Sequence, residues 1–262
     1  MNLDPLAASV APHLGAPAAA ASACATTLPA EAFPTAPGLT PLDIIGRDDR
    51  LPAPDVLQAP WRMVCHLLIQ DTRGAMHTGT GWIAGPSTVY TAGHNLLNHQ
   101  AGYAAARVWV VPGRDGQRAP HGQWETSAFD VHPQWRADQR AVVDVGVVWL
   151  AQPIGHNFGW FGFSVQPDSV LRGLPVRSAG YPDDKRPFGT QWFGDSPIHA
   201  ASPQQLAYGL DTMPGQSGSP VFAQDAAGRA VAVGVHVYGA VSENLAVRIS
   251  QPIFDTLSRW WR

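Results

Sequence analysis

Three short segments of the sequence carry a histidine, an acid and a serine in contexts that suit joint chemistry. Thr91-Ala92-Gly93-His94 directly follows an apolar run, and Asp144 opens the segment Asp-Val-Gly-Val-Val. Ser217 stands in the glycine-rich segment Gly215-Gln216-Ser217-Gly218-Ser219-Pro220, just before another apolar run. When a fold brings these three residue types together, they can act as nucleophile, general base and orienting acid.

Serine chemistry explains why the three side chains would belong together. A hydroxyl is a weak nucleophile at neutral pH and needs a base to accept its proton as it attacks. Imidazole titrates in the suitable range, and a carboxylate beside it fixes its tautomer and stabilises the imidazolium. We therefore expect Ser217 as the nucleophile, His94 as the base and Asp144 as the acid that orients the base.

The flanking glycines indicate a second function of the serine segment. A Gly-x-Ser-Gly turn uses backbone dihedrals that a β-carbon disfavours, so glycine suits both flanks. Such a turn can direct the backbone N–H groups of Gly215 and Ser217 to one point. We expect these two groups to form an oxyanion hole for the tetrahedral intermediate.

Each segment taken alone has a simpler explanation. A histidine after a strand is usually a satisfied core or rim residue, and an aspartate before valine is usually a turn acid. The serine segment could be an ordinary hairpin loop. The occurrence of all three segments, in the order His, Asp, Ser and in these local contexts, favours the catalytic interpretation.

The elements that must position these residues are predicted to be short strands. From Trp61 onward, apolar runs alternate with turn residues, as expected for a chain with 26 Gly and 24 Pro. The segment Gly155–Pro167 is expected to cross between two halves. The predicted strands are Trp61–Gln70, Gly79–Ala84, Thr88–Thr91, Arg107–Val111, Trp124–Val131, Val142–Leu150, Pro175–Ala179, Thr190–Phe193, Gln205–Leu210, Pro220–Ala223, Ala230–Tyr238 and Leu245–Ile249.

One helix is predicted, at the C-terminal end of the chain. Ser250 is a plausible N-cap and Pro252 falls in the first turn. Helical spacing would place four apolar residues on one face, namely Ile253, Phe254, Leu257 and Trp261. About a dozen strands and one helix predict an all-β fold of two antiparallel barrels, at about 55–152 and about 168–249, followed by helix 250–262.

These residues resemble the trypsin-like serine peptidases, and among them the bacterial glutamyl endopeptidases of the V8-protease type. The order of the three residues is that of the chymotrypsin type and differs from the subtilisin and α/β-hydrolase types. The resemblance runs from about Ile44 to the C-terminal helix and includes Gly180–Lys185, Tyr208–Pro220 and Gly234–His236. It implies two six-stranded barrels, an acyl-enzyme mechanism on protein or peptide substrates, and secretion from a bacterium.

The resemblance also implies a substrate-binding (S1) pocket for an acidic P1 residue. In the glutamyl branch, a Thr or Ser five residues before the nucleophile and a His on the following strand hold the P1 carboxylate. Thr212 and His236 match these positions. A buried carboxylate needs hydrogen-bond donors and preferably a positive partner, which these side chains can supply. The alternative is that His236 is a satisfied pocket-wall residue and that the S1 site accepts another side chain.

Two positions depart from the pattern of the family. Asn95 follows His94, where many relatives have a cysteine that closes a disulfide. Gln216 precedes Ser217, where the mammalian enzymes have an aspartate that pairs with a new N-terminal amine. Because Gln216 carries no charge, this chain cannot form that ion pair.

The first 43 residues differ in composition from the rest and are assigned to a separate segment. They are rich in Ala and Pro and contain no Lys or Arg, so they cannot bury a core of their own. We interpret 1–43 as a leader or pro-segment, with a plain disordered tail as the alternative, and 44–262 as the peptidase domain. Ile44–Arg50 resembles the mature start in the family, so cleavage is expected near Asp43–Ile44.

Composition argues against several other functions for this chain. The net charge of −3 gives no basic excess for binding nucleic acid or an anionic membrane, so neither is expected as a partner. We expect a monomer. The ten His show no short-range ligand spacing, so neither a metal nor another cofactor is expected. Cys24 and Cys65 are too few for a disulfide framework. Two other functions remain open: a catalytically silent homologue that binds peptides, and a non-proteolytic β-barrel module that uses its Trp residues to bind ligands.

Overall fold

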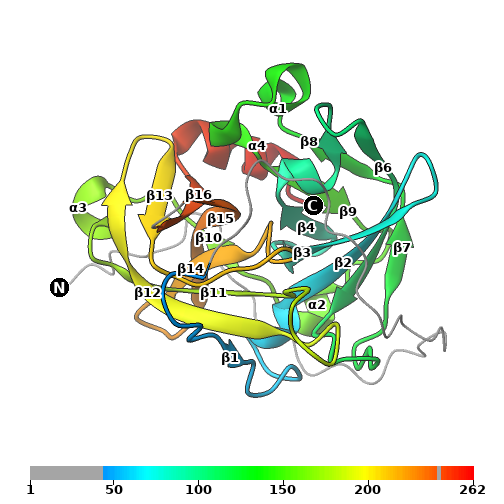
Figure 1. Ribbon diagram of the computed structural model, residues 1–262, viewed down its shortest axis with the longest axis horizontal. Coiled ribbons are helices and arrows are strands. Elements are labelled where there is room, and N and C mark those ends of the chain that lie inside the picture. Colours follow the sequence, from blue (N-terminus) through cyan, green and yellow to red (C-terminus); the bar gives the residue numbers. More distant parts are fainter. Residues whose placement is uncertain (1–43, 241–242) are drawn as a thin grey trace.

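The computed structural model describes residues 44–240 and 243–262. The expected leader or pro-segment 1–43 and Cys24 therefore lie outside the described residues. The described chain forms two antiparallel sheets that lie side by side, with β2 to β9 in one and β11 to β16 in the other (Figure 1).

The first sheet has eight strands in the order β5-β6-β2-β3-β4-β9-β8, and β7 pairs with β6. Its central strand β2 pairs with β3 on one side and β6 on the other. Seven of its eight residues are buried, so apolar side chains fill both faces. The bounds are β2 (Val64–Asp71), β3 (Met76–Ile83), β4 (Thr88–Thr91), β5 (Leu97–Asn98), β6 (Tyr103–Pro112), β7 (Trp124–Thr126), β8 (Phe129–Val131) and β9 (Gly146–Trp149).

The second sheet closes into a six-stranded barrel. Its strands follow the order β12-β11-β14-β15-β16-β13, and β13 pairs again with β12. The short strand β1 pairs with β12 in the antiparallel direction, and β10 pairs with β15 in the parallel direction. The bounds are β1 (Leu51–Pro52), β10 (Gly162–Phe163), β11 (Pro175–Gly180), β12 (Trp192–Ala201), β13 (Gln205–Tyr208), β14 (Pro220–Gln224), β15 (Ala230–Ala240) and β16 (Glu243–Arg248).

Helices are short except at the C-terminal end. The longest, α4 (Gln251–Trp260), starts after Ser250 as predicted, although the Ser250 side chain makes no capping hydrogen bond. The others are α1 (Pro133–Asp138), α2 (Gly155–Phe158), α3 (Asp168–Leu171) and the 3₁₀ helices η1 (Trp61–Met63), η2 (Gly93–Asn95) and η3 (Ala141–Val143). Helix α4 buries Ile253, Thr256 and Leu257.

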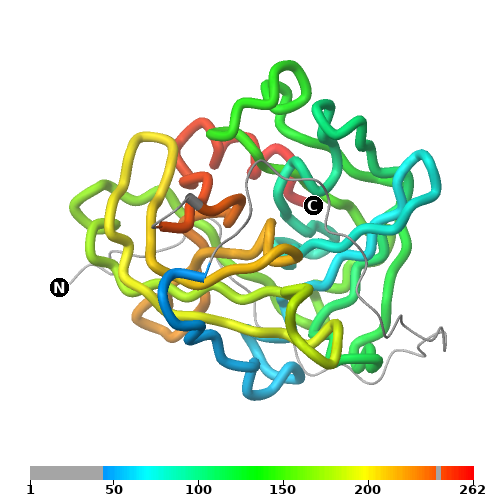
Figure 2. The backbone as a smooth tube through the Cα atoms, in the orientation of Figure 1, coloured from blue at the N-terminus to red at the C-terminus, as the bar shows by residue number. Residues whose placement is uncertain are grey.

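The C-terminal residues return from the second barrel to the first. The indole nitrogen of Trp261 donates to the carbonyl of Ala84 at 2.7 Å, and the amide of Ser87 donates to the carbonyl of Arg262 at 2.9 Å. The tube in Figure 2 shows this crossing, with the red end of the chain against the green and cyan strands. Trp261 therefore lies just beyond α4 and bonds to the first barrel, which corrects its expected place on the apolar helix face.

Several other local predictions were wrong in detail, among them the expected strand Val142–Leu150, which begins in the 3₁₀ helix η3 and becomes extended only at Gly146. The expected strand Trp124–Val131 is interrupted, because β7 pairs with β6 whereas β8 pairs with β9. The expected strand Trp61–Gln70 begins with the 3₁₀ helix η1 and becomes extended only at Val64. The predicted fold class, two antiparallel barrels with a C-terminal helix, is confirmed. Among the described residues the second barrel closes by strand pairing and the first is nearly closed, and the β10–β15 pair is parallel.

Candidate active site

The pairing of β4 with β9 brings a histidine and an acid together. Thr91 at the end of β4 is opposite Gly146 at the start of β9. The residues just after Thr91 and just before Gly146 therefore lie at the same edge of the sheet. Asp144 Oδ2 lies 2.6 Å from the Nδ1 atom of His94, and its Oδ1 accepts the backbone N–H of His94 at 2.8 Å. Both side chains are buried. The carboxylate thus holds both the ring and the backbone of His94.

The segment around Ser217 is a tight turn that packs on the first barrel. Gly215 and Gly218 have φ angles of +96° and +91°, which residues with a β-carbon rarely adopt. A β-carbon at position 218 would also collide with the carbonyl of Thr80. The backbone N–H of Thr80 donates to the carbonyl of Ser217 at 3.0 Å, which ties the turn to strand β3.

Asn95 provides a second link between the histidine segment and the serine turn. Its side-chain amide donates to the carbonyl of Ser217 at 2.9 Å and to the hydroxyl of Thr91 at 2.9 Å. Asn95 directly follows His94, so these bonds set where the turn lies relative to the imidazole. From the sequence, Asn95 was noted only because it stands where many relatives have a cysteine. Its polar side chain next to His94 was the feature that could have suggested this bonding role.

The hydroxyl of Ser217 is only weakly held. It donates to the carbonyl of Val237 at 3.3 Å, which is long for an O–H···O bond, and makes no hydrogen bond to His94. Catalytic hydrogen bonds are often long or poorly aligned before a substrate is bound. The structure therefore brings the histidine and the acid into direct contact and places the serine in a turn bonded to the residue next to the histidine.

The backbone amides of the serine turn alternate between bonded and free. The amide of Gln216 donates to the carbonyl of Met213 at 3.1 Å, and that of Gly218 donates to the carbonyl of His236 at 2.7 Å. Within residues 44–240 and 243–262, the amides of Gly215 and Ser217 have no such partner. Two donors on one turn are thus available to a ligand.

Thr212 and His236 each present a buried polar atom that has no partner among the described residues. These atoms are the hydroxyl oxygen of Thr212 and the Nε2 atom of His236. The other ring nitrogen of His236, Nδ1, lies 2.6 Å from the hydroxyl of Tyr208. Burial, together with a smaller contribution from the nearby His94, lowers the pKa of His236 to about 3. The ring is therefore neutral.

Tyr208 is a functional candidate that sequence reasoning missed. Burial raises the pKa of Tyr208 well above its usual value, so the phenol keeps its proton. When this proton is donated to Nδ1 of His236, the single proton of the neutral ring lies on Nε2. His236 then carries an N–H donor on Nε2, the buried atom without a partner among the described residues. The segment Tyr208–Pro220 was noted for its similarity to the family, but no role was assigned to its first residue.

Two further findings concern metals and membranes. Residues 44–240 and 243–262 contain no group of three or more His, Cys, Asp or Glu side chains close enough to bind a metal ion. Over the same residues, no helix has the length and apolar character needed to span a membrane.

Comparisons with known proteins agree with this architecture. The family model described as Trypsin matches residues 57–257. A Bacillus licheniformis protein named glutamyl endopeptidase is 36% identical over 224 residues, which cover 83% of this chain and 68% of the relative. A Bacillus subtilis protein named extracellular metalloprotease is 32% identical over 223 residues, covering 85% of this chain and 71% of the relative.

Solved structures share the fold at lower sequence identity. A Glu endopeptidase solved in complex with MPD superposes with a TM-score of 0.73 at 23% identity, covering 83% of this chain and 98% of that one. The protease Anisep from Arthrobacter nicotinovorans has a TM-score of 0.62 at 23% identity, covering 77% and 98%. The family match over most of the chain and the 36% identical relative together show that the chain belongs to the trypsin family and is a serine endopeptidase.

Proposed function

We propose that the enzyme hydrolyses peptide bonds through an acyl-enzyme formed on Ser217, with His94 as general base and Asp144 as its orienting acid. His94 Nε2 accepts the Ser217 proton as the oxygen attacks the scissile carbonyl. The resulting imidazolium gives this proton to the leaving amine. Water then attacks the ester, and His94 again takes and returns a proton. The observation that supports this assignment most strongly is the pair of hydrogen bonds between Asp144 and His94.

We assign the oxyanion hole to the backbone amides of Gly215 and Ser217. They are the two amides of the turn without a partner among the described residues, whereas those of Gln216 and Gly218 are already bonded. Preorganised backbone donors stabilise the charge that develops on the carbonyl oxygen, and removing one such donor typically costs about 10²- to 10³-fold in kcat.

We further propose that the enzyme prefers Glu or Asp at P1 and that Thr212 and His236 bind the P1 carboxylate. Both side chains have an unpartnered buried polar atom, and burying such atoms is unfavourable unless a ligand satisfies them. The Thr212 hydroxyl and the Nε2–H of His236 are both donors, and a carboxylate only accepts. The name of the Bacillus licheniformis relative agrees with this preference.

The first test uses peptides that differ only at P1, namely Glu, Asp, Arg, Phe and Ala, together with a serine-reactive phosphonate. We expect cleavage after Glu and Asp, and a phosphonate adduct that peptide mass spectrometry maps to Ser217. Ser219 in the same turn is an internal control, because its hydroxyl is bonded to the carbonyl of Gln216 at 2.6 Å and should remain unlabelled. Cleavage only after another residue would leave the assignment of Ser217 as nucleophile standing, but it would contradict the proposed preference for an acidic P1 residue. The absence of both cleavage and labelling would instead support a silent peptide-binding homologue.

Substitution of Thr212 by valine tests the pocket directly. The change removes the hydroxyl at nearly constant volume, and a hydrogen bond to a charged group contributes about 1.5–3 kcal/mol. We therefore expect kcat/KM for the Glu peptide to fall roughly 10- to 100-fold, while kcat/KM for the Ala peptide stays within about twofold because alanine cannot use the hydroxyl. Equal losses for both peptides would show that Thr212 has only a structural role.

We propose that the enzyme acts outside the cell as a monomer, after cleavage near Asp43–Ile44. The name of the Bacillus subtilis relative places that protein outside the cell, and Ile44–Arg50 resembles the mature start in the family. Asp43 lies outside the described residues. The net charge of −3 gives no indication of a nucleic-acid or membrane partner.

A further inference from the structure

Arg50 joins the beginning of the described chain to the serine turn. Its side chain is completely buried, and its Nη1 atom donates to the side-chain oxygen of Gln216 at 3.0 Å. Gln216 is the residue before Ser217, and it lies 166 positions from Arg50 along the chain. A buried cation thus contacts the neighbour of the nucleophile.

The guanidinium of Arg50 uses its whole set of donors. Asp48 accepts from Nε and Nη2 at 2.9 Å each, and Asp184 accepts from Nη1 at 3.1 Å and from Nη2 at 2.6 Å. With Gln216, this makes five contacts for five N–H groups. A lysine, with three donors on one atom, could not reproduce this arrangement.

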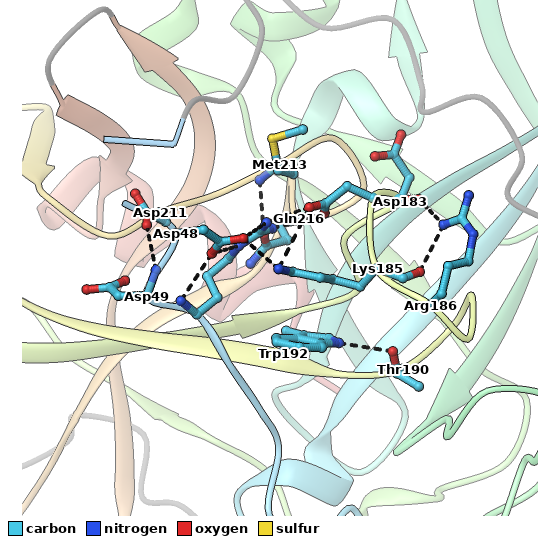
Figure 3. Close-up of polar contacts among 12 residues, drawn as sticks. Asp48, Asp49, Asp183, Lys185, Arg186, Thr190, Trp192, Asp211, Met213 and Gln216 are labelled. Carbon is cyan, nitrogen blue, oxygen red and sulfur yellow. Dashed lines mark hydrogen bonds and ion pairs between the residues drawn. The ribbon is translucent and has the colours of Figure 1, made fainter. Parts of the chain in front are cut away.

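The buried charge of Arg50 is paired with two partly exposed carboxylates, those of Asp48 and Asp184. Lys185 donates to Asp48 at 2.5 Å and lies 4.4 Å from the centre of the Trp192 ring (Figure 3). Two cations therefore face two carboxylates. The hydrogen bonds from Arg50 hold the pKa of Asp48 below its usual range. Because Asp48 and Asp184 fix the guanidinium, its remaining N–H points firmly at the turn.

The Gln216 side chain connects the fixed guanidinium of Arg50 to the backbone of the serine turn. Its side-chain oxygen also accepts the backbone N–H of Met213 at 3.0 Å, and its own backbone amide donates to the carbonyl of Met213 (Figure 3). The bonds from Arg50 and Met213 converge on one oxygen atom. They set the conformation of the peptide units on both sides, including the amides of Gly215 and Ser217.

Asp211 holds the same N-terminal segment at a second point. Its carboxylate accepts the backbone N–H of Ile45 at 2.6 Å and that of Asp49 at 3.0 Å, and Figure 3 shows the second of these bonds. Asp211 is the residue before Thr212 in the proposed S1 pocket. Residues 45–50 are thus tied both to the pocket wall and to the serine turn.

We propose that Arg50 is a positioning residue for catalysis, which acts through Gln216 to hold the serine turn with its oxyanion-binding amides correctly placed. This inference rests on the proposed role of Ser217 as nucleophile. Arg50 touches neither the substrate nor the reacting atoms. Its loss should therefore affect kcat, because the turn stabilises charge that appears only in the transition state.

The test is a double-mutant cycle with Arg50→Lys and Gln216→Met. Lysine keeps the positive charge between the two carboxylates, and methionine keeps the approximate volume of glutamine. We expect each single variant to lower kcat about 10-fold or more with KM within about twofold, as expected for a contact that stabilises only the transition state. The double variant should be no worse than the poorer single variant, because both changes break the same link.

Arg248→Lys is a matched control for simple loss of stability. Arg248 is also a buried arginine, bonded to Asp168 at 2.6 Å and to two backbone carbonyls, and it does not contact the serine turn. We expect this variant to lower Tm while kcat stays within about twofold of the wild type, since its contacts lie outside the site. The inference would be overturned if Arg50→Lys lowered Tm but left kcat unchanged. It would also be overturned if the loss of kcat in the double variant equalled the product of the losses in the two single variants.

Phosphonate labelling separates this inference from the proposed function. If wild-type Ser217 is labelled and Arg50→Lys is labelled about 10-fold more slowly, both are supported. If wild-type and Arg50→Lys are labelled at equal rates, the positioning role fails and the nucleophile stands. If the wild type is not labelled at Ser217, the proposed function itself fails. Should Arg50→Lys fold poorly, Gln216→Met alone gives the same comparison.

Discussion

Replacement of Ser217 by alanine is expected to lower kcat for peptide hydrolysis by about 10⁶-fold, the loss measured when a serine peptidase is deprived of its nucleophile. Without the hydroxyl, no acyl-enzyme forms, and only direct attack by water in the site remains. Because the hydroxyl makes a single long hydrogen bond within residues 44–240 and 243–262, to the carbonyl of Val237, the fold should be unaffected. Tm should change by only a few degrees.

The measurement is a progress curve on the Glu peptide with enzyme at high concentration. Ser178→Ala is the matched control, because Ser178 is a buried serine on β11 whose hydroxyl has no partner among residues 44–240 and 243–262. We expect this control to keep wild-type kcat. If Ser217→Ala retained more than about one per cent of the activity, a different residue would be the nucleophile.

Asp144→Asn is expected to lower kcat by about 10⁴-fold without disturbing the fold. Asp144 accepts two hydrogen bonds, one from the backbone N–H and one from the ring of His94. An asparagine has only one acceptor oxygen, which must face the backbone N–H. Its NH₂ group then donates to Nδ1, so the ring proton moves to Nε2 and the imidazole can no longer accept the serine proton.

The variant should be compared with Asp130→Asn by steady-state kinetics and by a structure of each. Asp130 lies on β8 next to β9, and its carboxylate pairs with Arg136 at the surface. We expect Asp130→Asn to keep kcat within about twofold of the wild type, since exposed ion pairs contribute little. If Asp144→Asn behaved in the same way, His94 would not depend on the acid for its tautomer, and the proposed triad would be wrong.

The sequence predicted the local features of the site better than its distant contacts. His94, Asp144 and Ser217 stand beside glycines and apolar runs that mark strand ends and turns, so their residue types and order were readable. The bond between Arg50 and Gln216 spans 166 residues and connects two segments without a shared pattern. Its only sequence signal was that Gln216 stands where the mammalian enzymes carry a charged residue.

Strand boundaries were likewise predicted well only where local sequence features mark them. Thr88–Thr91 was predicted with the observed bounds, because Gly-Pro precedes it and Gly93 follows it. Trp124–Val131 was predicted as one strand, although its apolar alternation changes phase at Ala128-Phe129. The structure divides it there because β7 and β8 pair with different neighbours, and these pairings depend on how the sheet curves rather than on local sequence alone.

Asn95 has a consequence for how this protein can be made and handled. Its amide joins two segments 122 residues apart, at the position where many family members use a pair of sulfur atoms. The one cysteine in the part of the chain that the structure describes, Cys65, is a buried free thiol. The contact between the two halves of the site therefore forms by ordinary hydrogen bonding. Folding of this region needs no oxidant or disulfide isomerase, and it can proceed in the reducing interior of a production host.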